Sequence, residues 1–243
     1  MGPVLGTPNS VSGELVVNVL LSSLDRECEE LIRSALSAAR IQVTVAENVF
    51  DALFGDTEPI YGCLILGESV ANVRQLRMQG VQFPILVILS DGTVDARVEA
   101  LAMGSDDCLG FPFSVSELVA RTQALLRRRG RAYDETTLMF GDLSLCSETC
   151  TAERNGDRVH LTPTEAELLR LFLENRGRVL SPHQIAETLW GADADVSFNL
   201  VSVHVANLRR KLAFVLSATP IQTLRGRGYV IHDLDSPALS KSG

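Results

Sequence analysis

The chain has 243 residues, of which 46% are hydrophobic and 21% are charged. This length suggests two domains of about 100 to 130 residues, each large enough to bury a core. The formal net charge of -8 excludes a protein that coats nucleic acid non-specifically, because such coating needs a broadly basic surface. The charge does not exclude a focused basic patch.

The sequence has no segment that indicates a membrane partner. Its longest apolar runs, such as 84–89, are too short to cross a bilayer, and residues 1–12 have neither a basic start nor an apolar core. Five cysteines without a C-x-x-C pair fit a reducing compartment. We therefore expect a cytoplasmic protein. Cys146 and Cys150 lie close in sequence, but no histidine completes a ligand pattern, so we expect no metal and no cofactor.

Residues 1–13 are rich in Pro, Gly and Ser and are expected to form a flexible tail. Over residues 14–129, short apolar runs alternate with helix-length amphipathic segments. The clearest helices are expected at 25–39 and 114–128, the second opening with a Ser114-x-x-Glu117 capping box. The strands are expected at 16–21, 41–45, 63–66, 85–89 and 108–110. This alternation predicts an α/β domain, a doubly wound parallel sheet of five βα units.

The order and spacing of these elements resemble a response-regulator receiver domain. The stretch from Gly104 to Phe113, GSDDCLGFPF, is similar to the G-A-D-D-Y-L-x-K-P-F motif of that family. The resemblance covers roughly residues 15–129. It implies a phosphorylation site at the carboxyl ends of the strands, where open α/β sheets carry their chemistry.

The residues at that site depart from the receiver pattern. Receivers hold Mg²⁺ with an acidic pair, phosphorylate an aspartate, and use a hydroxyl and a lysine to bind the phosphate. The matching positions here are Ser22, Ser23, Gly67, Ser90 and Phe111, and only the hydroxyl remains. We therefore predict a degenerate receiver without phosphoryl chemistry. Phe111 could fill the pocket; a collapsed site is favoured over a small-molecule pocket.

The resemblance also implies a homodimer through the receiver-like domain. In the resembled subfamily, paired receivers form ion pairs between subunits. The matching residues are Arg97 with Glu117 and Asp107 with Arg121, and all four keep the expected charge. The alternative is that they are solvated surface charges of little energetic weight. We predict a dimer that does not require phosphorylation.

A linker is expected at 130–137, with Gly130 ending the preceding helix. The second domain, 138–232, begins with four short alternating runs and an Asn155-Gly156 hairpin signal, which predict a small antiparallel sheet. Thr162-Pro163-Thr164-Glu165 and Ser181-Pro182-His183-Gln184 each predict a helix start. Residues 233–243 are expected to form a flexible tail.

A third helix is expected at 199–212, where Val201, Val205, Leu208 and Leu212 form one apolar face. Between Ser197 and His232 there is no Asp or Glu, but five basic residues are present. Two strands at 221–224 and 229–231 flank Gly226 and Gly228, which allow a tight hairpin. Three helices followed by a hairpin predict an α+β winged helix-turn-helix domain.

This half closely resembles the OmpR/PhoB DNA-binding domain, through Thr162-Pro-Thr-Glu165, Trp190-Gly191, Val201-x-Val-His-Val205 and Arg225-Gly-Arg-Gly-Tyr229. The resemblance implies that the third helix enters the major groove of promoter DNA and that the loop after Trp190 can face RNA polymerase. It places Ser202, Val203 and Asn207 on bases. It implies phosphate contacts, or a supporting role in such contacts, for Trp190, His204, Arg209, Arg210 and Tyr229. It also implies that Arg225 or Arg227 approaches the minor groove.

The third helix departs from many relatives at its start, where Asn199-Leu200 replaces an Arg-Thr or Arg-Ser pair. Asn199 lies on the predicted DNA-reading face. We predict a sequence-specific transcriptional regulator that acts without aspartyl phosphorylation. The alternative is an adaptor whose receiver-like domain docks a partner protein and whose third helix no longer reads bases. No nucleophile with its base and no phosphate-binding loop stands out, so we expect no enzymatic activity.

Overall fold

The computed structural model describes residues 18–55, 61–67, 70–132, 137–191, 198–216 and 220–232, and of residues 128–132 and 198–199 only the backbone. The tails expected at 1–13 and 233–243 lie outside these residues. So does 192–197, the loop after Trp190 that was expected to face RNA polymerase.

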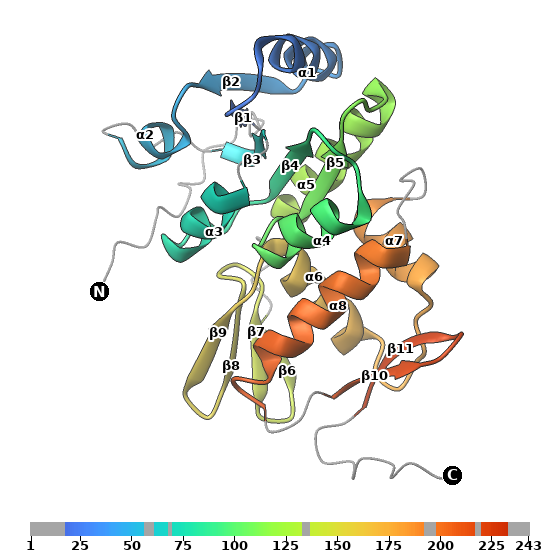
Figure 1. Ribbon diagram of the computed structural model, residues 1–243. Coiled ribbons are helices and arrows are strands. Elements are labelled where there is room, and N and C mark those ends of the chain that lie inside the picture. The colour runs from blue at the N-terminus through green and yellow to red at the C-terminus, as the bar shows by residue number, and fades with distance from the viewer. Residues whose placement is uncertain are drawn as a thin grey trace.

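The first domain is a parallel five-stranded sheet with helices on both faces (Figure 1). Its strand order is β2-β1-β3-β4-β5, and every neighbouring pair is parallel. This order belongs to the doubly wound folds and confirms the predicted α/β class. The strands are β1 (Asn18–Ser22), β2 (Gln42–Ala46), β3 (Tyr61–Leu66), β4 (Ile85–Leu89) and β5 (Asp107–Gly110). The helices are α1 (Arg26–Ala38), α2 (Val49–Phe54), α3 (Val70–Met78), α4 (Val94–Ala102) and α5 (Val115–Ala132).

Alternation along the strands divides the core into two layers. Val19 and Leu21 of β1 pack with Ile32 of α1 and Leu125 of α5. Leu20, between them, belongs to a second cluster with Leu101 of α4. Successive side chains of a strand point to opposite faces, so a continuously apolar strand is buried on both sides.

The last helix of this domain is longer than predicted. Gly130 was expected to end it, but α5 continues to Ala132. A glycine inside a helix costs about 1 kcal/mol relative to alanine and does not by itself break the helix. The expected linker at 130–137 is therefore partly helical, and 133–136 lies outside the described residues.

The second domain is a winged helix, as predicted. It begins with the antiparallel sheet β6-β7-β8-β9, in which Asn155 and Gly156 take positive φ angles of 53° and 90° at the β8–β9 turn. Thr162 and Ser181 cap the next two helices with complete capping boxes. The elements are β6 (Thr137–Phe140), β7 (Leu143–Cys146), β8 (Thr151–Arg154), β9 (Asp157–His160), α6 (Pro163–Glu174), α7 (Pro182–Trp190), α8 (Phe198–Leu212), β10 (Ile221–Leu224) and β11 (Gly228–Ile231).

The β10–β11 hairpin is fixed to the start of α7 by a backbone bridge. Leu180 donates its N–H to Tyr229 O at 2.8 Å and accepts from Tyr229 N at 2.9 Å. Gly228, next to the bridge, has a φ of 136°, and a Cβ there would lie 2.0 Å from Leu180 O. The close approach therefore requires glycine at 228 and fixes the direction of the hairpin.

The two domains are packed against each other, and α8 lies beside α4 (Figure 1). One cluster of contacting buried side chains runs from Leu101 and Cys108 of the first domain to Leu200 and Val201 of the second. Within the described residues, no helix has the length and apolarity needed to cross a membrane.

Candidate functional site

Gly67, the predicted counterpart of the phosphorylated aspartate, is closely covered by backbone. Gly67 follows β3, and its N–H donates to Ser22 O at 3.1 Å. Ser23 has a positive φ of 61°, which turns its carbonyl toward Gly67. A Cβ at residue 67 would lie 1.9 Å from Ser23 O and 2.7 Å from Ser23 C. The backbone as it stands accommodates no side chain at 67.

The other predicted pocket residues differ in burial. Ser22 is buried, and among the described residues its Oγ has no hydrogen-bond partner, whereas Ser90 is exposed. Phe111 is 41% exposed, and its ring packs edge-on against that of Phe113, with the ring centroids 5.7 Å apart. The expectation that Phe111 fills the pocket is wrong, because this side chain is exposed.

The four residues expected at the dimer interface form contacts inside the chain in this conformation. The Arg121 guanidinium donates to both Asp107 carboxylate oxygens, at 3.1 and 2.9 Å, and to Glu117 at 2.8 Å. The Asp107 side chain is fully buried and that of Arg121 is 3% exposed. Burial lowers the pKa of Arg121, but the two carboxylates outweigh burial and raise it. Arg97 donates to Gly92 O at 3.1 Å.

The predicted base-reading face of α8 lies partly against the first domain. Asn207 is 7% exposed, and its Nδ2 donates to Leu101 O of α4 at 3.1 Å. Leu200 and Val203 line a small pocket together with Val98 of α4. Ser202 is exposed, whereas the Asn199 side chain lies outside the described atoms. This conformation therefore covers Asn207 and part of Val203.

Two of the predicted phosphate-contact residues are buried inside the winged helix. Trp190 is 1% exposed and His204 2% exposed, and their ring centroids are 5.5 Å apart. In this conformation these side chains position α7 against α8. Arg209 donates to Ile221 O at 3.1 Å and lies 5.8 Å from the Tyr229 ring centre, so it connects α8 to the wing.

Arg210, Arg225 and Arg227 are exposed. The two wing arginines flank Gly226, whose φ is 71°. The turn is closed by the Arg227 N–H, which donates to Leu224 O at 2.9 Å. Both arginines are therefore placed at the tip of the wing, as predicted from the glycine spacing.

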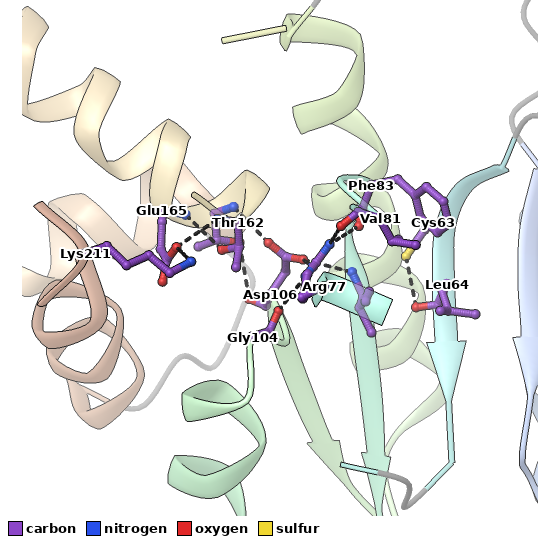
Figure 2. A network of polar contacts seen from close by, with 12 residues as sticks. Cys63, Leu64, Arg77, Val81, Phe83, Gly104, Asp106, Thr162, Glu165 and Lys211 are labelled. Carbon is purple, nitrogen blue, oxygen red and sulfur yellow. Dashed lines mark hydrogen bonds and ion pairs between the residues drawn. The ribbon is translucent and has the colours of Figure 1, made fainter. Parts of the chain in front are cut away.

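Sequence reasoning missed the residue that joins the two domains, Asp106 (Figure 2). It is fully buried. Its carboxylate binds the Arg77 guanidinium and accepts from Ile85 N at 2.9 Å in the first domain, and it accepts from Thr164 N at 2.8 Å in the second. The sequence shows that the first N–H groups of the helix at 163 need an acceptor, but not which residue supplies it.

A receiver-like α/β domain followed by a winged helix DNA-binding domain defines a transcriptional response regulator. Residues 156–231 match the family model described as "Transcriptional regulatory protein, C terminal". Response regulator MprA of Mycobacterium ulcerans is 36% identical over 227 residues, which cover 89% of this chain and 98% of MprA. Response regulator protein PmrA of Pseudomonas aeruginosa is 44% identical over 167 residues, 68% of this chain and 72% of PmrA.

Solved structures show the same two-domain fold. Two mutants of RitR, at 22% and 21% identity, superpose with TM-scores of 0.71 and 0.73 over 89% of this chain and 99% of theirs. The chain belongs to the OmpR/PhoB-type family of transcriptional response regulators.

Proposed function

We propose that this chain is a sequence-specific DNA-binding regulator whose receiver-like domain works without aspartyl phosphorylation. The main support for phosphorylation independence is the backbone around Gly67, where the Ser23 carbonyl oxygen occupies the space that the Cβ of any side chain would need. A phosphoryl group needs a carboxylate nucleophile and a divalent cation held by oxygen ligands. The matching positions supply two serines and a glycine.

DNA binding is assigned to α8 and to the wing. Ser202, Arg210, Arg225 and Arg227 are accessible in the described conformation. Asn207 and the covered part of Val203 become accessible only when α8 leaves α4, because Asn207 is bonded to Leu101 O and Val203 lines a pocket with Val98 of α4. DNA therefore binds an open form of the protein and shifts the equilibrium between closed and open forms toward the open one. The size of the shift is set by how much more tightly DNA binds the open form than the closed form.

The receiver-like domain is proposed to form a homodimer through α4, β5 and α5. Arg97, Asp107, Glu117 and Arg121 lie on this face and are the residues that would pair between subunits. The same face carries α8 in the closed chain, so dimerisation and DNA binding both require separation of the domains. The two events then favour each other without a phosphoryl group.

The DNA-binding proposal is tested by selecting genomic fragments with purified, unphosphorylated protein and footprinting those enriched. Protected direct repeats about 10 to 11 base pairs apart are expected for two subunits on one face of the duplex. No enrichment at low salt would reject DNA binding and favour the alternative function, an adaptor whose receiver-like domain docks a partner protein.

The receiver proposal is tested with acetyl phosphate and Mg²⁺. We expect no covalent phosphate by intact mass and no change in dimer fraction by sedimentation. Stoichiometric labelling of an acidic residue would overturn phosphorylation independence.

A further inference from the structure

A cleft of about 450 Å³ lies between the two domains. Its walls come from α3, the end of α4, the start of α6 and the last turn of α8. Met78, Leu101 and Leu161 contribute apolar surface. A volume of several hundred Å³ with mixed apolar and polar walls is typical of a small-molecule site.

Two of the cations that line the cleft are neutralised by carboxylates. Arg77 binds Asp106 and also donates to Gly104 O at 3.0 Å and Val81 O at 2.7 Å (Figure 2). Lys211 binds Glu165, whose side chain is 3% exposed. These ion pairs stabilise the walls of the cleft, and they leave Arg77 and Lys211 with little uncompensated positive charge for a ligand.

Two further cations line the same cleft. Arg74 belongs to α3 of the first domain, and Arg210 to α8 of the second. In the part of the chain that the structure describes, neither is paired with a carboxylate, and Arg210 donates only to the neutral Asn207 Oδ1, at 3.0 Å. Both arginines are exposed. The protein as a whole carries a net charge of -8, so this local excess of positive charge is unusual for it.

We propose that the interdomain cleft binds a small polyanion, carrying phosphate or carboxylate groups, between Arg74 and Arg210. Guanidinium groups bind both anions through paired N–H donors. The site is complete only in the closed arrangement, because its two uncompensated arginines belong to different domains. The anion therefore stabilises the closed form.

The consequence for regulation rests on the proposed function. Arg210 is also a predicted contact for DNA phosphate, so polyanion and DNA compete for it. A ligand that binds only the closed form weakens DNA binding by the factor one plus its concentration divided by its Kd. At ten times the Kd, the apparent affinity for DNA falls about tenfold.

Binding is measured first without DNA, so that its outcome is independent of the proposed function. Inorganic pyrophosphate and citrate are titrated calorimetrically into the full chain at constant ionic strength. The first probe represents phosphate ligands and the second carboxylate ligands. We expect at least one to bind with a Kd of about 1 mM or tighter.

Arg74→Gln and Arg210→Gln are each expected to weaken that binding about tenfold, because each removes a charge-assisted contact. Arg33→Gln removes an exposed arginine from α1, outside the cleft, and should leave the Kd unchanged. Thermal unfolding of each variant checks that it is folded. Absence of binding by both probes, or equal binding by the wild type and both cleft variants, would overturn the proposal.

A second measurement tests the consequence with the promoter fragment. The bound anion should weaken DNA binding by the wild type and not by Arg74→Gln, whose residue lies outside the predicted DNA contacts. An anion that binds the cleft without this effect would overturn the closed-form mechanism. Failure to find any DNA target would reject the proposed function and leave the calorimetric result standing.

Discussion

The Asp106 carboxylate of the receiver-like domain caps helix α6 of the winged helix by accepting the Thr164 N–H at 2.8 Å. Thr164 returns a second bond, from its Oγ1 to Asp106 O at 3.3 Å. Helix N-termini carry unpaired N–H groups and a partial positive charge, so a carboxylate there is favourable. The closed arrangement thus contains a specific polar contact as well as the apolar contact between α4 and α8.

We predict that Thr164→Val shifts the protein toward its open form. The change keeps the shape of the side chain and removes the hydroxyl that binds Asp106 O. A net loss of about 1 kcal/mol from the closed form corresponds to an increase of about fivefold in DNA affinity. The measurement is fluorescence anisotropy with the selected promoter fragment.

Thr44→Val is the matched control for this prediction. Thr44 lies in β2, and its Oγ1 accepts from Asn18 Nδ2 at 2.7 Å, within the first domain. The Thr44→Val variant should bind the promoter fragment with the affinity of the wild type. Equal affinities for Thr164→Val and Thr44→Val would show that the hydroxyl contact does not hold the domains together.

The local elements were predictable because their signals are local. The capping residues Thr162 and Ser181 fix two helix starts, and Asn155-Gly156 fixes a hairpin. The parallel sheet followed from continuously apolar runs, which only a sheet covered on both faces can bury. The end of α5 was mispredicted, because one glycine carries a small energetic penalty that the packing of α5 against α6 and α7 can offset.

The relation between the domains was not predictable from the same signals. The face of α8 that holds Val203 and Asn207 suits base edges, and it also suits the end of α4. An amphipathic pattern indicates which residues of a helix are buried, but it does not indicate which surface covers them. The charges of Asp107 and Arg121 likewise fit pairing within one chain or between two, and the described chain uses the first.

We predict that Gly67→Ala destabilises the protein. A Cβ at this position meets Ser23 O at 1.9 Å, so the loop after β1 must move. Overpacking of this kind costs about 1–3 kcal/mol, which urea unfolding measures. Gly92→Ala is the control, because its Cβ would have its nearest neighbours at 3.5 Å.

The same steric conflict predicts that Gly67→Asp does not create a phosphorylation site. The Cβ of the new aspartate would need the space of the Ser23 carbonyl oxygen, and Ser22 and Ser23 offer no carboxylate to a metal ion. Intact mass after incubation with acetyl phosphate should be unchanged. A Gly67→Ala variant as stable as Gly92→Ala would refute the collapsed geometry.

We predict that alkaline pH destabilises the protein through Cys108. Burial, followed by the nearby Asp107, raises the pKa of this thiol from 9.0 to about 12. Below the unfolded pKa of 9.0 the thiol is protonated in both states, and the free energy of unfolding is not reduced by its titration. As pH rises from 9.0 toward 12 the free energy of unfolding falls, because the Cys108 thiol loses its proton first in the unfolded chain. Between about pH 8 and about pH 10 the loss is about 1 kcal/mol.

The test is urea unfolding of the wild type and Cys108→Ser at both pH values. Serine does not titrate in this range, so the variant should lose less stability at the higher pH, whatever its stability at the lower one. Cys150 keeps its own raised pKa of about 12 in both proteins and cancels from the comparison. Identical pH dependence would exclude Cys108 as a contributor.

We predict that Arg225→Ala combined with Arg227→Ala weakens promoter binding at least tenfold. The two exposed arginines flank Gly226 at the tip of the wing, where they can reach the phosphates and the minor groove. Each lost phosphate contact also lowers the slope of log K against log salt by about 0.9. The measurement is anisotropy over a series of salt concentrations.

The control removes two arginines elsewhere, Arg26→Ala with Arg33→Ala on α1, and changes the net charge equally. Both double variants change the net charge by the same amount, so a difference between them depends on where the arginines lie and not on the charge of the whole protein. The wing has no role in DNA binding if the two affinities and the two salt slopes agree. A wing variant that loses affinity but keeps the slope of the wild type would assign these arginines to the shape of the hairpin rather than to phosphate contact.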